Sequence, residues 1–377
     1  MVKITRYRLL MARNNIILMA GRTGGPLTPL LAMSTHLPYR PFILGVRGGY
    51  EEKVARTQGY PFLPLPATKL SALSFAGNRA RLLLELPKQL VLLIWALILS
   101  LIYVFQHQPV AVLGAGGFTS VPMTLAVRLY RLLGNDTRII IHQQDPLVGV
   151  ANKVALRFAD TRSYVYQTSL QSGLLDTAQQ IPNPIQIERY SSEALRGLES
   201  EFSKLTTFLH SRSKPVLLVF GGGSGAKVIN DWIVASASAL LPRFAIVHLT
   251  GLLQDTPLEP LEYPDYWRQE FAFTEMPLLM HHASVVLCRA GLGSISELMY
   301  LQKPAFLVPL AGSHQELNAK EVADYFAVLD QNQTGDWVRT ITTRYPDYFD
   351  NISWPSRDAY RQALYEYYAL VGQSIDK

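Results

Sequence analysis

Residues 216–230 read Val-Leu-Leu-Val-Phe-Gly-Gly-Gly-Ser-Gly-Ala-Lys-Val-Ile-Asn. Five apolar residues predict a buried strand, the glycines break it, and a helix is expected from about residue 226 to 241. Glycine lets the backbone approach a phosphate closely, and free N–H groups at a helix start attract an anion. The stretch therefore predicts either an anion-binding turn or simply a tight strand-to-helix connection, which needs the same glycines.

The same succession of strand, glycines and helix occurs three more times along the chain. Glycines follow the predicted strands 16–20, 110–113 and 285–288, in Gly21-Arg22-Thr23-Gly24-Gly25-Pro26, Gly114-Ala115-Gly116-Gly117 and Arg289-Ala290-Gly291-Leu292-Gly293. Strands that alternate with helices are typical of a parallel sheet with right-handed crossovers. We therefore predict an α/β fold.

The remaining elements follow from hydrophobic runs and helical periodicity. Further strands are expected at 41–45, 62–65, 138–141, 244–249, 271–273 and 306–309. Helices are expected from about residue 28, and at 51–58, 123–133, 152–158, 316–326 and 356–370.

The length of 377 residues exceeds one ordinary core and predicts two domains. Residues 181–184, Ile-Pro-Asn-Pro, form a rigid extended linker, so we expect domains at 1–185 and 186–350, followed by a C-terminal segment, 351–377. The single cysteine, Cys288, excludes an intrachain disulfide. The first fifteen residues lack a long apolar segment with a small-residue cleavage site, so no secretory signal is expected.

Charge divides the chain into two unlike halves. Residues 1–185 contain 19 Lys and Arg against 7 Asp and Glu, whereas residues 186–377 contain 16 against 22. A basic N-terminal half suits nucleic acid, an anionic membrane surface or a phosphorylated substrate. The hydrophobic run at 90–105 favours the membrane, and we expect no nucleic-acid partner.

Leu90–Phe105 is the most apolar segment, with sixteen residues of which only Ser100 is polar. We expect a helix that starts at Pro87. Sixteen residues fall short of the ~20 that cross a bilayer, so the helix is not expected to span. Two interpretations stay open: a buried crossover helix, or a helix whose apolar side enters the membrane surface beside basic residues.

Polar side chains follow one strand of the first half, in His142-Gln143-Gln144-Asp145. Parallel α/β proteins bind ligands at the edge of the sheet where the strands have their carboxyl ends. A solvated loop would show the same polar sequence. In the second half, Ser294 and Glu297 have capping-box spacing, so Glu297 either caps a helix or binds a ligand. No metal-ligand spacing, Walker sequence or Gly-x-Gly-x-x-Gly after the first strand is present, so neither a metal nor a cofactor is expected.

With these motifs in order, the chain resembles the bacterial peptidoglycan glycosyltransferases of family 28. The likeness covers almost the whole chain. Its motifs are Gly-x-Thr-Gly-Gly at 21–25, Gly-x-Gly-Gly-Phe-x-Ser-x-Pro at 114–122, His142-x-Gln144 with Asn152-Lys153, Asn183-Pro184, the loop 221–230, Cys288-Arg289-x-Gly291 through Ser296-Glu297, and His314-Gln315 with Asn318-Ala319.

The resemblance implies the GT-B fold, in which two Rossmann-like parallel-sheet domains face a cleft and a C-terminal helix crosses back to the N-terminal domain. It implies an inverting, metal-independent transfer of N-acetylglucosamine from UDP-N-acetylglucosamine to lipid I, which gives lipid II. The expected partners are therefore this UDP-sugar, a polyprenyl-diphosphate acceptor and the membrane surface, reached through Leu90–Phe105. The expected location is peripheral, on the cytoplasmic side of the bacterial cytoplasmic membrane.

The resemblance also assigns roles to residues. Glu297 would bind the ribose, Phe273 the uracil, backbone N–H groups of Leu292 to Ser294 the diphosphate, and Gln315 the sugar. The implied donor-binding residues are Gly222, Gly223, Ser224, Phe273, Arg289, Gly291, Leu292, Gly293, Ser294, Glu297, His314 and Gln315. The implied acceptor-binding residues are Thr23, Gly24, Gly25, Gly116, Gly117, Ser120, Gln144 and Asn152.

The chain departs from the family where proton transfer is expected. Pro26 replaces a histidine, and the family's His-Glu-Gln-Asn reads His142-Gln143-Gln144-Asp145. Gly223 stands where the family has the loop serine, with Ser224 following, and Gln186 stands where an arginine is expected. Either the chain is an active transferase with His142 or Asp145 as base, or it acts on another lipid acceptor or has lost catalysis. A third reading is a non-enzymatic membrane-associated binding protein.

Overall fold

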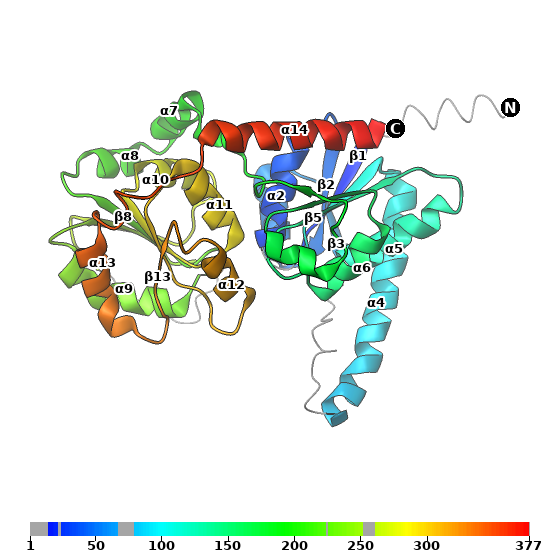
Figure 1. The fold of residues 1–377 in the computed structure, drawn as a ribbon, viewed down its shortest axis with the longest axis horizontal. Coiled ribbons are helices and arrows are strands. Elements are labelled where there is room, and N and C mark those ends of the chain that lie inside the picture. The colour runs from blue at the N-terminus through cyan, green and yellow to red at the C-terminus, as the bar shows by residue number, and fades with distance from the viewer. Residues whose placement is uncertain (1–13, 22–23, 67–78, 224, 252–260, 377) are drawn as a thin grey trace. The chain divides into compact units, whose positions relative to one another are not determined.

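The computed structural model describes residues 14–21, 24–66, 79–223, 225–251 and 261–376, with side chains omitted for 79–86. The chain divides into two compact units, and the division runs through its last helix. Unit 1 comprises Met1–Ile185 and Gln362–Lys377, and unit 2 comprises Gln186–Arg361. Figure 1 shows a sheet with helices around it in each unit.

The described part of unit 1 is built on seven parallel strands in the order β3-β2-β1-β4-β5-β6-β7. The strands are β1 (Asn15–Met19), β2 (Arg40–Val46), β3 (Phe62–Leu65), β4 (Ala111–Gly114), β5 (Arg138–Gln143), β6 (Thr161–Tyr164) and β7 (Gln179–Gln180). The helices are α2 (Gly24–Ser34), α3 (Tyr50–Gln58), α4 (Arg79–His107), α5 (Ser120–Arg131), α6 (Val150–Phe158) and the 3-10 helix η2 (Gln167–Ser172).

The described part of unit 2 repeats the plan with six parallel strands in the order β10-β9-β8-β11-β12-β13. The strands are β8 (Val216–Phe220), β9 (Ala245–Leu249), β10 (Tyr266–Gln269), β11 (Val285–Cys288), β12 (Ala305–Leu307) and β13 (Ala327–Val328). The helices are η3 (Ile187–Tyr190), α7 (Ser192–Glu201), α8 (Ser203–His210), α9 (Lys227–Leu240), α10 (Met276–His282), α11 (Leu292–Leu301), α12 (His314–Glu321), η4 (Thr334–Asp336), α13 (Trp337–Arg344) and α14 (Arg357–Asp376), which continues into unit 1.

The central strands of both sheets are apolar and buried, apart from the half-buried Asn15 at the start of β1. β8 is Val-Leu-Leu-Val-Phe and every one of its residues is buried, as are all four residues of β11. Parallel sheets covered by helices on both faces need such continuous apolar runs, because neither face meets water. This confirms the predicted α/β fold with two Rossmann-like sheets, the architecture called GT-B.

The carboxyl-terminal part of α14 packs on unit 1. Tyr367 and Val371 are fully buried, and the Tyr367 hydroxyl lies 2.7 Å from Ser163 Oγ. Two further hydrogen bonds hold the end of the helix, Tyr39 Oη to Asp376 Oδ1 at 2.6 Å and Thr161 Oγ1 with Ser374 Oγ at 2.7 Å. The helix extends six residues beyond the predicted segment 356–370 because these contacts stabilise its end.

Several predicted boundaries are wrong. α2 begins at Gly24, inside the glycine turn, and α12 ends at Glu321 instead of residue 326. The strand predicted at 271–273 is a loop, and the neighbouring strand is β10, whose Tyr266 hydroxyl bonds His248 Nδ1 on β9 at 2.7 Å. The strands β6 and β7 carry too few apolar residues, and β13 has too few residues, for prediction from the sequence.

Helix α4 is longer than predicted and continues through Pro87 instead of starting there. Pro87 is exposed, so water can hydrate the carbonyl that the proline leaves unpaired. Its segment Pro87–His107 has 21 residues and is long and apolar enough to cross a membrane, which removes the length argument against crossing. Figure 1 shows the amino-terminal part of α4 extending away from the sheet of unit 1.

Candidate functional site

The glycine turns lie at the points where the strand order of each sheet reverses. In unit 1 the central neighbours β1 and β4 are followed by the turns at Gly21 and Gly114, and Met19 pairs with Gly114. In unit 2 the central neighbours β8 and β11 are followed by Gly221 and Arg289, and Phe220 pairs with Cys288. The crevice beyond the carboxyl ends of strands at such switch points is where open α/β sheets bind ligands.

In unit 1 the two glycine turns pack directly against each other. A Cβ placed on Gly117 would lie 2.4 Å from the Gly21 Cα, and Gly117 has a φ of +87°. The Thr119 hydroxyl donates to the carbonyl of Ala20 and so ties the second turn to the end of β1. Position 117 thus requires glycine for two reasons, the close approach of the two backbones and the left-handed conformation.

The predicted acceptor-side residues gather around these turns. Ideal Cβ positions on Gly25 and Gly116 lie 3.8 Å from Gln144 Nε2 and 4.0 Å from Asn152 Nδ2, respectively, and the Gly116 position lies 3.9 Å from Pro26. Ser120 begins α5 and its hydroxyl donates to the Gly116 carbonyl at 3.3 Å, whereas Gly24 begins α2. Thr23 lies outside the described residues.

Two buried amide oxygens at this place make no hydrogen bond within the described structure, Gln144 Oε1 and Asn152 Oδ1. A buried acceptor without a partner costs about 1–3 kcal/mol, so such oxygens are suited to hydroxyl or amide donors of a ligand. Gln144 directly follows β5, and Asn152 lies on α6, eight positions further along the chain.

Gln143, which stands where the family has glutamate, holds this segment together. Its Nε2 donates to the carbonyls of Asp145 and Leu147 at 2.7 and 3.1 Å, and its Oε1 accepts from Asn152 Nδ2 at 2.6 Å. An ionised glutamate has no N–H to donate and could make only the last of these bonds. The amide therefore fits a positioning role better than proton transfer.

His142 is fully buried at the end of β5. Its Nδ1 lies 2.9 Å from Ser163 Oγ and its Nε2 lies 3.1 Å from Asn183 Oδ1, so both ring nitrogens are engaged within unit 1. Burial lowers the pKa of His142 to about 4. This enclosure argues against the prediction that His142 is the base, because the ring cannot reach a substrate without breaking the network. Asp145, half-buried just after the strand, remains the candidate.

In unit 2 the turn after β8 is tight. A Cβ on Gly221 would lie 2.3 Å from the Ala226 nitrogen, and Gly222 and Gly225 both have positive φ, +86° and +85°. The Gly225 N–H donates to the Gly222 carbonyl at 3.0 Å, and α9 begins one residue after Ala226. Gly223 lies in this turn, whereas Ser224 lies outside the described residues.

The second turn of unit 2 places a helix start at the same edge of the sheet. Gly291 is the N-cap of α11, and the first helical hydrogen bond runs from Ile295 N to the Gly291 carbonyl. The N–H groups of Leu292, Gly293 and Ser294 are therefore the donors that a helix leaves without an internal partner. Ser294 lies inside α11, so the capping-box interpretation of Ser294 and Glu297 is wrong.

Glu297 lies one turn further along α11, partly exposed. Burial raises the pKa of the Glu297 carboxyl, whereas the Arg189 charge and the Tyr190 hydroxyl lower it. Arg189 donates to the carbonyl of Phe273 and to that of Thr274 at 3.4 Å, and its guanidinium lies 5.2 Å from the centre of the Phe273 ring. Arg189 thus contacts Phe273 and acts on Glu297 through its charge, and it was missed from the sequence.

The remaining predicted donor residues lie on neighbouring segments of unit 2. Arg289 Nη1 donates to the carbonyls of Val308 and Pro309 and to Gln331 Oε1 at 2.9–3.2 Å, so Arg289 braces the loop after β12. Gln315 Oε1 accepts from Leu310 N at 3.0 Å, and Ser313 caps α12 at His314, which is exposed. Asn318 Nδ2 donates to the Ala290 carbonyl at 3.1 Å and connects α12 to the turn before α11.

A cavity of about 330 Å³ lies elsewhere in unit 1, by the amino ends of β5 and β6. It is lined by Arg138, Asp160, Thr161, Arg162, Thr177, Gln179, Leu370, Gln373 and Ser374. None of the predicted site residues lines it, because they follow the carboxyl ends of the strands.

Both halves of the chain match known protein domains. Residues 16–163 match the glycosyltransferase family 28 N-terminal domain, and residues 216–338 match the glycosyltransferase family 28 C-terminal domain. The two matches together span most of the chain and include the glycine turns of both units.

Similar proteins share one kind of name. UDP-N-acetylglucosamine–N-acetylmuramyl-(pentapeptide) pyrophosphoryl-undecaprenol N-acetylglucosamine transferase 3 of Bacillus cereus is 33% identical over 260 residues, 66% of this chain and 69% of that protein. Transferase 2 of the same species is 28% identical over 93% of this chain and 95% of its own length. Among solved structures, Acinetobacter baumannii MurG has a TM-score of 0.63 at 20% identity, covering 96% of this chain and 99% of that one.

A solved enzyme of another name has a similar fold. UDP-GlcNAc 2-epimerase from Neisseria meningitidis, bound to UDP-GlcNAc, has a TM-score of 0.59 at 14% identity, covering 95% of this chain and 99% of that one. At such identities the likeness concerns the fold alone.

Proposed function

The chain belongs to glycosyltransferase family 28, and on this basis we propose that it transfers N-acetylglucosamine from UDP-N-acetylglucosamine to lipid I, forming lipid II. The names of its relatives support this reaction. The structural observation that carries the proposal is the group in unit 2 formed by Phe273, Glu297 and the start of α11. Arg189 contacts Phe273, and its charge acts on Glu297.

Unit 2 is proposed as the donor domain. The Glu297 carboxylate would accept hydrogen bonds from the ribose hydroxyls, and Phe273 would contact the uracil. The diphosphate would meet the free N–H groups of Leu292 to Ser294, where the helix macrodipole also favours negative charge. Gln315, whose oxygen already bonds Leu310 N, would present its amide N–H groups to the sugar.

Unit 1 is proposed as the acceptor domain. Its buried oxygens Gln144 Oε1 and Asn152 Oδ1 suit the hydroxyl and acetamido N–H donors of a sugar acceptor. They lie beside Gly25 and Gly116, where a Cβ would meet no other atom closer than 3.8 Å, so the backbone there is open to a ligand. The proposed limits of the functional domains are 1–185 and 186–350, with 351–377 as a returning C-terminal segment.

The proposed reaction is a single displacement with inversion. The acceptor hydroxyl forms a bond to C1 of N-acetylglucosamine while the bond from C1 to the UDP oxygen breaks, and the hydroxyl proton passes to a base. N–H donors at a helix start are preorganised for the charge that develops on the departing diphosphate. We propose Asp145 as the base, because a carboxylate is ionised at neutral pH and His142 is enclosed.

Helix α4 is proposed to bring unit 1 to the cytoplasmic face of the cytoplasmic membrane, where a polyprenyl acceptor resides. Its exposed apolar face, called here the α4 stripe, consists of Leu90, Val91, Ile94, Trp95, Ile98, Ile102 and Phe105. The opposite side, with Ala96, Ser100 and Val104, is fully buried in unit 1. A helix packed on protein along one side favours insertion of the other side into the membrane surface over a crossing.

The test is a transfer assay with radiolabelled UDP-N-acetylglucosamine and purified lipid I, offered or withheld. We expect label in the lipid fraction only when lipid I is present, with equimolar release of UDP. Retained UDP binding without transfer would overturn the proposed reaction and favour the catalytically impaired alternative. Transfer to a different lipid acceptor alone would overturn the acceptor assignment and leave the donor site intact.

A further inference from the structure

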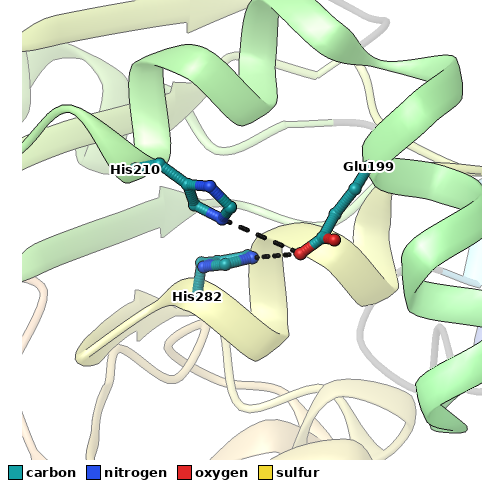
Figure 2. A group of neighbouring side chains, drawn as sticks. All are labelled: Glu199, His210 and His282. Carbon is teal, nitrogen blue, oxygen red and sulfur yellow. Dashed lines mark hydrogen bonds and ion pairs between the residues drawn. The ribbon is translucent and has the colours of Figure 1, made fainter.

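Three side chains of unit 2 that no part of the proposed reaction uses converge at one place. Glu199 lies in the last turn of α7, and His210 and His282 are the last residues of α8 and α10. Figure 2 shows both imidazole rings directed at the Glu199 carboxylate. Glu199 and His210 are 11 positions apart, and His210 and His282 are 72 positions apart. A search for metal-ligand spacing in the sequence therefore does not find this group.

The ligand atoms have the spacing of a metal site. His282 Nε2 lies 3.4 Å and His210 Nε2 lies 3.7 Å from the same oxygen, Glu199 Oε1, and one such atom from each residue lies within 4.8 Å of the others. Tetrahedral bonds of about 2.0–2.2 Å to zinc place ligand atoms roughly 3.4 Å apart. The distance from His282 to Glu199 already matches this spacing, whereas the distances from His210 to Glu199 and to His282 have to shorten. The His210 side chain is 54% exposed.

We propose that Glu199, His210 and His282 bind one Zn²⁺ ion, with water completing the coordination. Two imidazole nitrogens and one carboxylate oxygen are a donor set that zinc accepts. The ion would fasten α7, α8 and α10 to one another. The competing interpretation is an ion pair of Glu199 with protonated histidines, which requires no metal.

The test uses the full chain without an affinity tag, stripped with a chelator and titrated with Zn²⁺ by calorimetry. Co²⁺ serves as a spectroscopic probe. Three variants each remove one ligand: Glu199→Gln, His210→Ala and His282→Ala. His281→Ala is the matched control, since it removes an imidazole from the same turn of α10 that contacts His282 only edge-on, at 5.1 Å between ring centres.

We expect saturable binding of one ion per chain, visible absorption of tetrahedral Co²⁺, and a Zn²⁺-dependent rise in Tm. Each ligand variant should lose at least about tenfold in affinity, because even loss of an outer partner of a metal ligand costs that much. His281→Ala should bind as the wild type does. Absence of 1:1 binding, or equal binding by all four variants, would overturn the site. The His210→Ala variant must be folded, so that its loss of binding is not a result of misfolding.

Discussion

Arg189 is the residue on which the proposed donor site depends most. Its guanidinium contacts the Phe273 ring and carbonyl, and its charge lowers the pKa of Glu297 against the effect of burial. The chain carries Gln186 where the family has arginine, and Arg189 follows three residues later on η3. A positive charge is therefore present beside the carboxylate although the expected position lacks one.

Arg189→Gln should shift the pH dependence of UDP binding. Ribose binding needs the ionised Glu297, so affinity is present above the pKa of Glu297 and falls as the pH drops through it. Without the Arg189 charge that pKa rises, and the fall begins at a higher pH. Calorimetric UDP titrations between about pH 8 and pH 5 measure this. Arg189→Lys is the control that keeps the charge, and identical profiles for wild type and Arg189→Gln would contradict the prediction.

Asp145→Asn should reduce turnover far more than donor binding. Loss of a positioned base costs about 10²–10⁴-fold in rate, so kcat should fall by that factor while the affinity for UDP-N-acetylglucosamine changes little. Asp176→Asn, an exposed carboxylate of the same unit, is the control and should keep full activity. Unchanged kcat in Asp145→Asn would remove Asp145 from the mechanism.

At the scale of elements, two variants separate the contact between the glycine turns from the effect of a positive φ. Gly117→Ala adds a methyl 2.4 Å from the Gly21 Cα at a φ of +87°, whereas Gly134→Ala adds one at +86° with nothing within 4 Å. A positive φ alone costs about 1–2 kcal/mol.

We therefore expect Gly134→Ala to lower the free energy of unfolding by about 1–2 kcal/mol and Gly117→Ala by more than about 3 kcal/mol, because the two turns must also separate. Urea unfolding of both variants measures the difference. Equal losses would mean that the contact between the glycine turns contributes nothing beyond the conformation of the backbone.

The α4 stripe should decide membrane binding. Asp at both Val91 and Ile98, whose side chains are exposed, should abolish co-sedimentation with phospholipid vesicles, since charged groups are costly in an apolar environment. Val328→Asp in β13 changes a comparably exposed apolar residue of unit 2 and is the control. Circular dichroism verifies folding. If the double variant still co-sediments fully with vesicles, the α4 stripe does not bind the membrane.

At the scale of the whole molecule, the uneven charge predicts a salt-sensitive association with membranes. The basic residues are concentrated in 1–185, with 19 Lys and Arg against 7 Asp and Glu, the part that also contains α4. Raising NaCl from about 0.05 to 0.5 M should weaken binding to anionic vesicles strongly and binding to neutral vesicles little, because salt screens exposed charges. Equal salt dependence for both vesicle types would exclude an electrostatic contribution.

Much of the architecture could be predicted because it depends on local patterns. The runs that became β1, β8 and β11 are almost entirely apolar and are followed within three residues by glycine, and both properties are visible in a few consecutive residues. The true extent of α4 could not be predicted, since proline normally starts or breaks a helix and the pattern alone suggested Pro87 as its beginning. The strand at Tyr266–Gln269 also needed its neighbours, as Tyr266 bonds His248 on β9.

By itself the sequence determined the α/β class, the glycine turns and the candidates on either side of them, because these follow from side-chain periodicity and backbone freedom over short stretches. Only the tertiary structure decided which candidates meet. It enclosed His142 between Ser163 and Asn183, and it brought Arg189 to Phe273, 84 positions away. It also joined Glu199 to two histidines. Contacts of this kind depend on how elements pack, which no short stretch of sequence specifies.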